Sequence, residues 1–138
     1  MTPAAPPETT YTFDVSGLVP ADLPGGFFVG WPSPPSPEKH LQVLRGSYRA
    51  LVALEAGRVV GFITAISDGV ATAFIPWLEV LPEAQGRGIG SVLVRRMQDE
   101  LADLYSIDLV CDDGVAPFYD QLGWHRAQAM IQRNPGYL

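Results

Sequence analysis

The stretch Gln85-Gly86-Arg87-Gly88-Ile89-Gly90-Ser91 decides how this chain is interpreted. An extended segment that ends Leu78-Glu79-Val80-Leu81-Pro82 precedes it, and apolar residues at helical spacing follow it from Ser91 to about Leu104. Glycines let a backbone approach an anion without Cβ atoms in the way, and a helix N-terminus attracts negative charge. The sequence therefore predicts a phosphate-binding turn between a strand and a helix. The alternative is a glycine-rich turn that caps the helix and binds no ligand.

The spacing of the glycines shows which of the known phosphate-binding motifs this stretch can match. Glycines at 86, 88 and 90 do not fit the dinucleotide pattern G-x-G-x-x-G, and no acid follows in the required βαβ context. Lys39 is the only lysine, so the chain has no Gly-Lys-Ser/Thr sequence. The pattern Q-x-x-G-x-G does fit, on Gln85, Gly88 and Gly90. It resembles the acyl-CoA pyrophosphate loop of the GNAT superfamily of acyl-CoA-dependent N-acyltransferases.

A second motif lies one predicted helix and one predicted strand further on. The segment Val115-Ala116-Pro117-Phe118-Tyr119-Asp120-Gln121-Leu122-Gly123-Trp124 resembles the signature A-x-x-F-Y-x-x-x-G-F/W that follows the fifth strand of GNAT proteins. Two motifs in the right order are more specific than either alone. With the hairpin before them they extend the resemblance over residues 48–133, while the N-terminal third matches in outline only.

The resemblance implies an α/β (α+β) fold, with a mixed, twisted sheet of six or seven strands and about four helices. We expect one domain over residues 1–138, with 1–9 as a flexible tail. The fourth and fifth strands, here Val70–Leu81 and Ile107–Cys111, would splay apart and admit the pantetheine arm of acetyl-CoA. The implied cofactor-binding residues are Leu78 and Val80 for pantetheine, and Gln85, Gly86, Arg87, Gly88, Ile89, Gly90 and Ser91 for the phosphates.

Other elements follow from local patterns. Alternation predicts strands at Tyr11–Val15, Tyr48–Glu55, Arg58–Ser67 and Trp124–Gln132. Ser36 and Pro37 predict a helix start, with Gly46 at its end, and a short helix is expected over Val115–Leu122. Pro76 cannot donate to a sheet ladder, so it predicts a bulge, an edge or a break inside the strand Val70–Leu81.

Acyl transfer to an amine requires a neutral amine, a donor for the oxyanion and a proton for the departing thiolate. The resemblance implies Tyr119 as the general acid, since a phenol with a pKa near ~10 can protonate a thiolate near ~8.5; the alternative is a packing tyrosine. Glu79 is the first candidate base, on the same face of its strand as Trp77; the alternative is an exposed carboxylate. Asp112 and Asp113 stand where many relatives carry an asparagine that contacts the cofactor.

The segment Pro20–Pro37 is long for a loop and rich in proline and glycine, yet it carries three large aromatic residues. It is either a lid over a binding site or a plug at the edge of the core. Together with Trp77, its rings either form an acceptor pocket with an apolar or aromatic preference or pack into the core. The residues concerned are Phe27, Phe28, Trp31 and Trp77.

Composition excludes several classes of protein. The net charge of −6 disfavours a nucleic-acid partner, and no apolar run approaches the roughly 20 residues of a membrane span. The first eight residues lack the features of a signal peptide. The single cysteine, Cys111, excludes an intrachain disulfide, favours a cytoplasmic location and is expected to end a buried strand. His40 and His125 are expected to be packing or surface residues, and no metal site is predicted.

These observations predict an N-acetyltransferase that moves an acetyl group from acetyl-CoA to a primary amine of a small molecule, by direct transfer in a ternary complex. The protein would be a monomer or a homodimer. Two alternatives remain open: an acyl-CoA-binding regulatory module of the same fold without catalysis, and a peptide or protein N-acetyltransferase.

Overall fold

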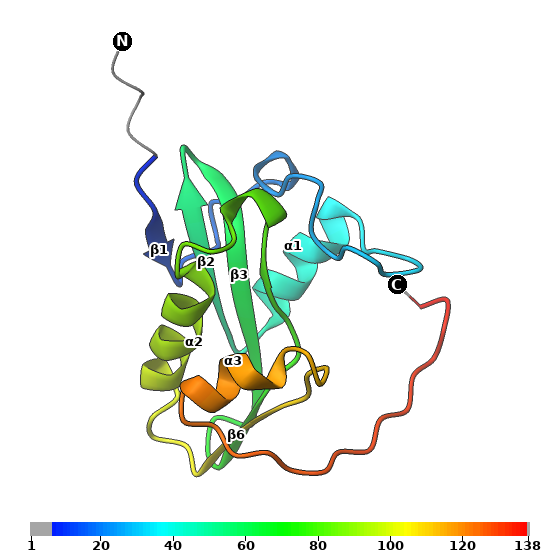
Figure 1. Ribbon diagram of the computed structural model, residues 1–138. Helices are drawn as coiled ribbons and strands as arrows, with labels where there is room; N and C mark the ends of the chain where they lie inside the picture. The colour runs from blue at the N-terminus through cyan, green and yellow to red at the C-terminus, as the bar shows by residue number, and fades with distance from the viewer. Residues whose placement is uncertain (1–6, 138) are drawn as a thin grey trace.

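The computed structural model describes residues 7–137, which form a six-stranded mixed sheet with three α-helices (Figure 1). The predicted GNAT-like mixed fold is confirmed, with three α-helices where about four were expected. Short 3-10 turns at Pro20–Asp22 and Pro82–Ala84 complete the regular structure. The strands are β1 (Thr10–Thr12), β2 (Arg49–Glu55), β3 (Arg58–Ser67), β4 (Thr72–Ile75), β5 (Leu78–Val80) and β6 (Ser106–Leu109), and the helices are α1 (Pro37–Gly46), α2 (Ile89–Glu100) and α3 (Ala116–Gln121).

Strand β3 is the centre of the molecule and is buried on both faces. The strands follow the order β1-β2-β3-β4-β6, and β5 also pairs with β3. Gly61 of β3 faces α2, where a Cβ would lie 3.2 Å from Leu93, whereas the neighbouring Phe62 packs against His40 of α1 with ring centroids 4.3 Å apart. Because successive side chains of a strand point to opposite faces, α1 and α2 cover opposite sides of the sheet.

The sheet splits where Pro76 interrupts the chain. Before the proline, β4 pairs in parallel with β6, from Thr72 opposite Ser106 to Ile75 opposite Leu109. After the proline, β5 pairs with β3 alone among the described strands, and β6 has already ended. The predicted break at Pro76 and the predicted splay between the fourth and fifth strands of the family are therefore confirmed.

The structure corrects the predicted C-terminal strand. Residues 124–132 form no strand, and the segment 124–137 leaves α3 as an extended arm that curves away from the body (Figure 1). Alternation in a sequence gives a strand only where the segment pairs with an edge, and the arm pairs with no strand among the described residues. Cys111 is also exposed beyond the end of β6, instead of ending a buried strand.

Smaller differences concern the ends of elements. The first strand covers Thr10–Thr12 only, and six of the nine residues of the predicted tail lie outside the described part. Helix α2 begins at Ile89, two residues earlier than expected, with Gly88 as its N-cap. It ends at Glu100, earlier than the expected Leu104, because the N–H groups of Ala102 and Leu104 bond three residues back rather than four. No helix among the described residues is long and apolar enough to cross a membrane.

Candidate active site

A cavity of about 470 Å³ opens between β5, the glycine-rich loop and α3. All of the predicted cofactor-binding residues except Arg87 line this cavity, although they come from strand β5, the glycine-rich loop and the start of helix α2. Val115, the N-cap of α3, and Phe118 within α3 close the opposite side. The lining residues are Leu78, Glu79, Val80, Ala84, Gln85, Gly86, Gly88, Ile89, Gly90, Ser91, Val115 and Phe118.

The loop presents the N-terminus of α2 to this cavity. Gly86 has φ 77° and Gly88 has φ 83°, a left-handed conformation that glycine adopts without strain. Gly88 is the N-cap of α2, where no side chain caps the helix and no acidic residue occupies the first turn. The N–H groups at the start of α2 are therefore left for a ligand, and the helix dipole favours an anionic one.

The free edge of β5 forms the adjoining wall. The carbonyl of Trp77 accepts from Thr64 N–H, and the N–H of Leu81 donates to Val60, so these residues bond to β3. Hydrogen bonding alternates along an antiparallel pair. The backbone groups of Leu78 and Val80 consequently point the other way, toward the gap that the splay leaves, where an extended amide chain can pair with them.

Two side features shape the same wall. The Gln85 side chain donates from Nε2 to the carbonyl oxygen of Val80 over 3.1 Å and so fixes the loop to the end of β5. A Cβ at Gly90 would lie 3.7 Å from the Phe118 ring and 3.8 Å from Val80. A side chain at position 90 would thus fill the space in which α2, α3 and β5 converge.

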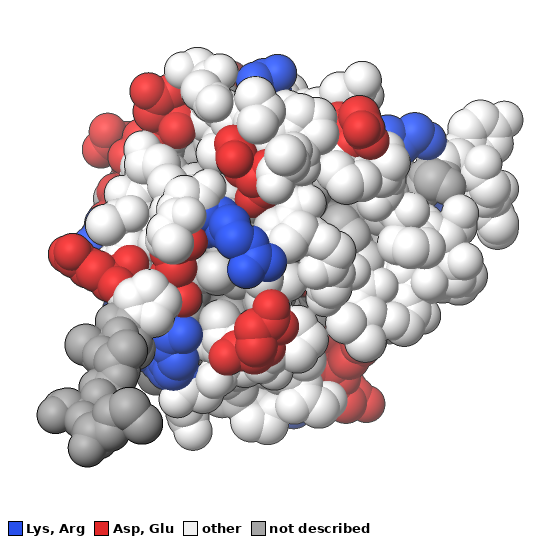
Figure 2. All heavy atoms as spheres, turned by 90° about the horizontal axis from the view of Figure 1, so that it is seen from above, with Lys and Arg blue, Asp and Glu red and all other residues white. Residues whose placement is uncertain are grey.

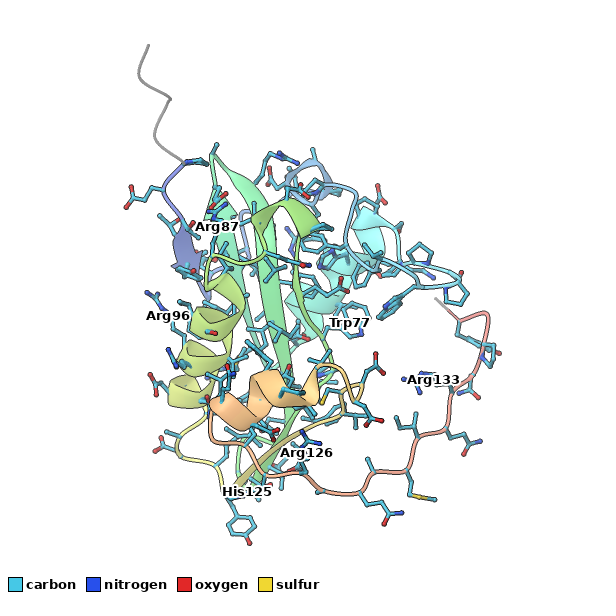
Figure 3. The ribbon with its side chains drawn as sticks, in the orientation of Figure 1. Trp77, Arg87, Arg96, His125, Arg126 and Arg133 are labelled. Atoms are coloured by element: carbon cyan, nitrogen blue, oxygen red, sulfur yellow. The ribbon has the colours of Figure 1, made fainter. Side chains whose placement is uncertain are left out.

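Arg87 is turned away from the cavity. Its guanidinium forms an ion pair with the buried carboxylate of Glu55 and a 3.2 Å hydrogen bond with Thr9. The hydrogen bond from Arg87, and then that from Thr9, lowers the pKa of Glu55. Figure 3 shows Arg87 above α2, beside the N-terminal end of β1. The side chain therefore ties the glycine-rich loop to the end of the β2–β3 hairpin.

Glu79 connects β5 to the proline-rich loop. Its Oε1 accepts the N–H of Phe28 over 2.7 Å, a contact across 51 residues of sequence. Half-burial raises the pKa of the Glu79 carboxyl, and the hydrogen bond from Phe28 opposes the rise. A half-buried carboxylate with a raised pKa is suited to accepting a proton. Phe28 itself has φ 60°, which is unusual for a residue with a Cβ.

The four aromatic residues considered for the acceptor site divide into two pairs. Phe27 and Phe28 are buried in the core, whereas Trp31 and Trp77 stay partly exposed. The Trp31 and Trp77 rings meet edge-on at 5.6 Å, and Phe28 lies 4.9 Å from Trp31 and 5.1 Å from Trp77. Phe27 and Phe28 thus anchor the loop to the core, and Trp31 of the loop lies beside Trp77, which directly precedes β5.

His40 lies behind these aromatic rings, with its own ring 5.1 Å from that of Phe28 and 4.3 Å from that of Phe62. It is 2% exposed, its Nε2 has no partner among the described residues, and burial lowers its pKa to about 4. The imidazole is therefore neutral at physiological pH and packs as part of the core, as expected from the sequence. The other histidine, His125, is exposed.

Tyr119 lies beside the cavity but is not in its lining. Its ring packs edge-on against Phe118 at 4.9 Å and against Trp124 at 5.7 Å, and the residue is 8% exposed. Burial, with a smaller contribution from Cys111, raises the pKa of the phenol to about 12. The hydroxyl therefore keeps its proton and can act as a hydrogen-bond donor.

Charges are mixed on the face seen from above, where lysine and arginine lie singly among acidic residues (Figure 2). Within residues 7–137, no cluster of three or more histidine, cysteine or acidic side chains is placed to hold a metal.

The model of the Acetyltransferase (GNAT) family matches residues 19–124 of this chain. The chain belongs to the GNAT family. A crystal structure from Deinococcus radiodurans R1, provisionally classed as an acetyltransferase, is 45% identical in sequence to this chain, with a TM-score of 0.89. The alignment covers 96% of this chain and 93% of the Deinococcus radiodurans chain. A GNAT family protein of Streptococcus pneumoniae TIGR4 is 26% identical, with a TM-score of 0.72 and coverage of 93% and 98%.

Curated relatives match over a shorter region. The GCN5-related N-acetyltransferase 3, chloroplastic, of Arabidopsis thaliana is 40% identical over 70 residues, which is 49% of this chain and 30% of the relative. This GNAT chain thus spans less than a third of that protein's length.

Proposed function

We propose that this GNAT protein transfers an acetyl group from acetyl-CoA to a primary amine of a small molecule, by direct transfer in a ternary complex. One observation carries the proposal: the uncapped N-terminus of α2, reached through Gly86 and Gly88, adjoins the free edge of β5 in a single cavity. A diphosphate attached to a flexible diamide chain complements these two surfaces. Family membership supports acyl transfer as the class of reaction.

The cofactor would be held almost entirely by backbone. The N–H groups from Gln85 to Ser91 would bind the pyrophosphate, and those of Leu78 and Val80, with their carbonyls, would pair with the pantetheine amides. The Arg87 side chain would act indirectly, by fixing the loop through Glu55. No metal enters this scheme.

Glu79 and Tyr119 would move the protons. The amine nitrogen attacks the thioester carbonyl carbon, a C–N bond forms, the C–S bond breaks, and Glu79 takes the amine proton directly or through water. Burial raises the pKa of the Tyr119 phenol to about 12, so the phenol would keep its proton as the C–S bond breaks, and the sulfur would depart as a thiolate whose thiol has a pKa near ~8.5. Its contribution would be a hydrogen bond to the departing sulfur.

The acceptor would lie against Trp31 and Trp77, with Phe27 and Phe28 supporting them from the core. Partly exposed indole rings favour an apolar or aromatic portion in the substrate, and they attract a cationic one. The Glu79 carboxylate, on the same face of β5 as Trp77, would attract the ammonium form before deprotonation. A cytoplasmic location, and a monomeric or homodimeric state, remain part of this proposal.

The test measures thiol release from acetyl-CoA with a panel of amines, for wild type and for Tyr119→Phe. Turnover of at least one small amine, with a reduced kcat for Tyr119→Phe, is the expected result. Binding of CoA with no turnover of any amine would instead identify a non-catalytic module. Acetylation of peptides alone would identify a peptide N-acetyltransferase.

A further inference from the structure

Phe28 has an unusual backbone conformation in the proline-rich loop. Its φ of 60° lies in the left-handed region, and a residue with a Cβ keeps this conformation only where its surroundings over-determine it. The residue is 5% exposed, and its ring packs among aromatic neighbours at centroid distances of 4.9–6.3 Å. These neighbours are Phe27, Trp31, His40, Phe62 and Trp77. The buried ring therefore holds the main chain of Phe28 in a strained conformation.

The N–H of this strained residue points at the candidate base. It donates to Glu79 Oε1 over 2.7 Å. Glu79 lies opposite Phe62 in the β3–β5 pair, so these two side chains share a face of the sheet. The Phe28 ring lies 6.0 Å from the Phe62 ring, so one cross-strand pair receives both the ring and the N–H of Phe28. Because Glu79 also lines the cavity, this hydrogen bond fixes the carboxylate at the cavity wall.

The carbonyl of Phe28 is bonded to the partly exposed tryptophan of the same loop. It accepts the N–H of Trp31 over 3.1 Å, which closes a β-turn over residues 28–31. Gly30, the third residue of the turn, has φ 84°, a conformation that glycine adopts without strain. The main chain of Phe28 therefore connects Glu79, through its N–H, with Trp31, through its carbonyl.

We propose that Phe28 is a positioning residue: its main chain holds the Glu79 carboxylate and the Trp31 ring at a fixed relative position, so that an acceptor packed on Trp31 presents its amine to Glu79. This inference rests on the proposed acetyl transfer and adds the group that aligns the base with the acceptor. Phe28 does not line the cavity and transfers no proton. It acts through Glu79, because the rate of a proton transfer depends on how the base is oriented toward the amine.

Replacing Phe28 by phenyllactic acid, its α-hydroxy analogue, tests the N–H. The resulting ester keeps the ring and the carbonyl of residue 28 and lacks the donor to Glu79. The kcat for an amine that the wild type acetylates should fall about tenfold, while KM for the amine and Kd for CoA stay unchanged. The same ester in the Glu79→Gln background should cause no further loss, because the base that the N–H aligns is already absent.

The ester should also move the acidic limb of the pH profile. Burial raises the pKa of Glu79 and the hydrogen bond from Phe28 lowers it, so loss of this bond should shift the limb to higher pH. Carbon-13 NMR of the Glu79 carboxyl should show the same upward shift without any turnover. A residue that only stabilised the loop would lower the urea midpoint and leave this limb where it is.

Two glycine variants separate the geometry of the loop from its stability. Gly30→Ala and the control Gly69→Ala each place a Cβ on a left-handed backbone, with φ 84° and 76°. That Cβ would meet nothing within 4 Å at Gly30 and would make an ordinary 3.4 Å contact with Tyr48 at Gly69. Both variants should lower the urea midpoint to a similar extent. Only Gly30→Ala, in the turn that joins Phe28 to Trp31, should also lower kcat and raise KM for the amine.

Each of three results would overturn this inference while acetyl transfer itself stands. They are a wild-type kcat in the Phe28 ester, a loss of kcat by the ester that is undiminished in the Glu79→Gln background, and an equal loss of kcat in the two glycine variants. A wild-type protein that acetylates no amine would overturn both the inference and the proposed function.

Discussion

Glu79 has two roles in this structure, and two substitutions separate them. The carboxylate anchors the proline-rich loop through the 2.7 Å hydrogen bond from Phe28, and it is the candidate base. Glu79→Gln keeps an acceptor for the Phe28 N–H and removes the base. Glu79→Ala removes both. The comparison therefore distinguishes an effect on chemistry from an effect on loop position.

The expected magnitudes follow from the type of contact. A hydrogen bond to a charged acceptor contributes about 1.5–3 kcal/mol, and one to a neutral acceptor about 1 kcal/mol. Glu79→Ala should therefore lower the free energy of unfolding by about 2 kcal/mol, and Glu79→Gln by clearly less. Loss of a general base lowers kcat by roughly 10²–10⁴, and this loss should be common to both variants.

The assay is thiol release as a function of pH, beside urea unfolding and CoA titration. Because burial raises the pKa of Glu79, the acidic limb of the wild-type pH profile should lie above the ordinary pKa of 4.5 of a glutamate, and Glu79→Gln should lose that limb. CoA affinity should be unchanged in Glu79→Gln. Wild-type kcat in Glu79→Gln would refute the role as base and leave the loop anchor as its only function.

Three further predictions concern the scaffold. Burial lowers the pKa of His40 from 6.5 to about 4, so the neutral imidazole stabilises the fold fully above pH 6.5. The free energy of unfolding should fall by about 3 kcal/mol as pH drops from 6.5 to 4. Urea unfolding against pH should show this slope, and His40→Leu should abolish it. Gly61→Val places atoms against Ile89 and Leu93, each 3.2 Å from a Cβ, and should cost about 1–3 kcal/mol in urea unfolding; an unchanged midpoint would contradict the packing described. Arg87→Gln should lower the melting temperature yet change the Kd for CoA only slightly, and a large loss of affinity at unchanged stability would show that the guanidinium contacts the cofactor.

Local patterns were sufficient for most of the fold. The bounds of β3 agree with the prediction, because its turn residues and apolar run are local signals. Pro76 predicted the break in the sheet for a local reason too, since a proline lacks the N–H that a ladder needs. The glycine-rich loop could be predicted because its backbone conformation depends on glycines that are visible in the sequence.

Contacts between distant segments could not be predicted in this way. Nothing local indicates that Arg87 pairs with Glu55, or that Glu79 accepts from Phe28. The arm shows the converse problem: its alternation predicted a strand, but a strand forms only with a partner edge, and the partner is not set by the segment itself. The burial of Phe27 and Phe28 likewise depends on a core that only the folded chain assembles.

The central claim is that the main chain around the start of α2 binds the diphosphate of coenzyme A. Isothermal titration of CoA into wild type and into Gly88→Glu tests it most directly, because this residue has φ 83° and any side chain there is strained by about 1–2 kcal/mol and, if acidic, repels phosphate. We predict saturable heat for wild type and none for a Gly88→Glu variant that keeps its circular dichroism spectrum. No heat with folded wild type, or equal affinity in the two proteins, would contradict the account.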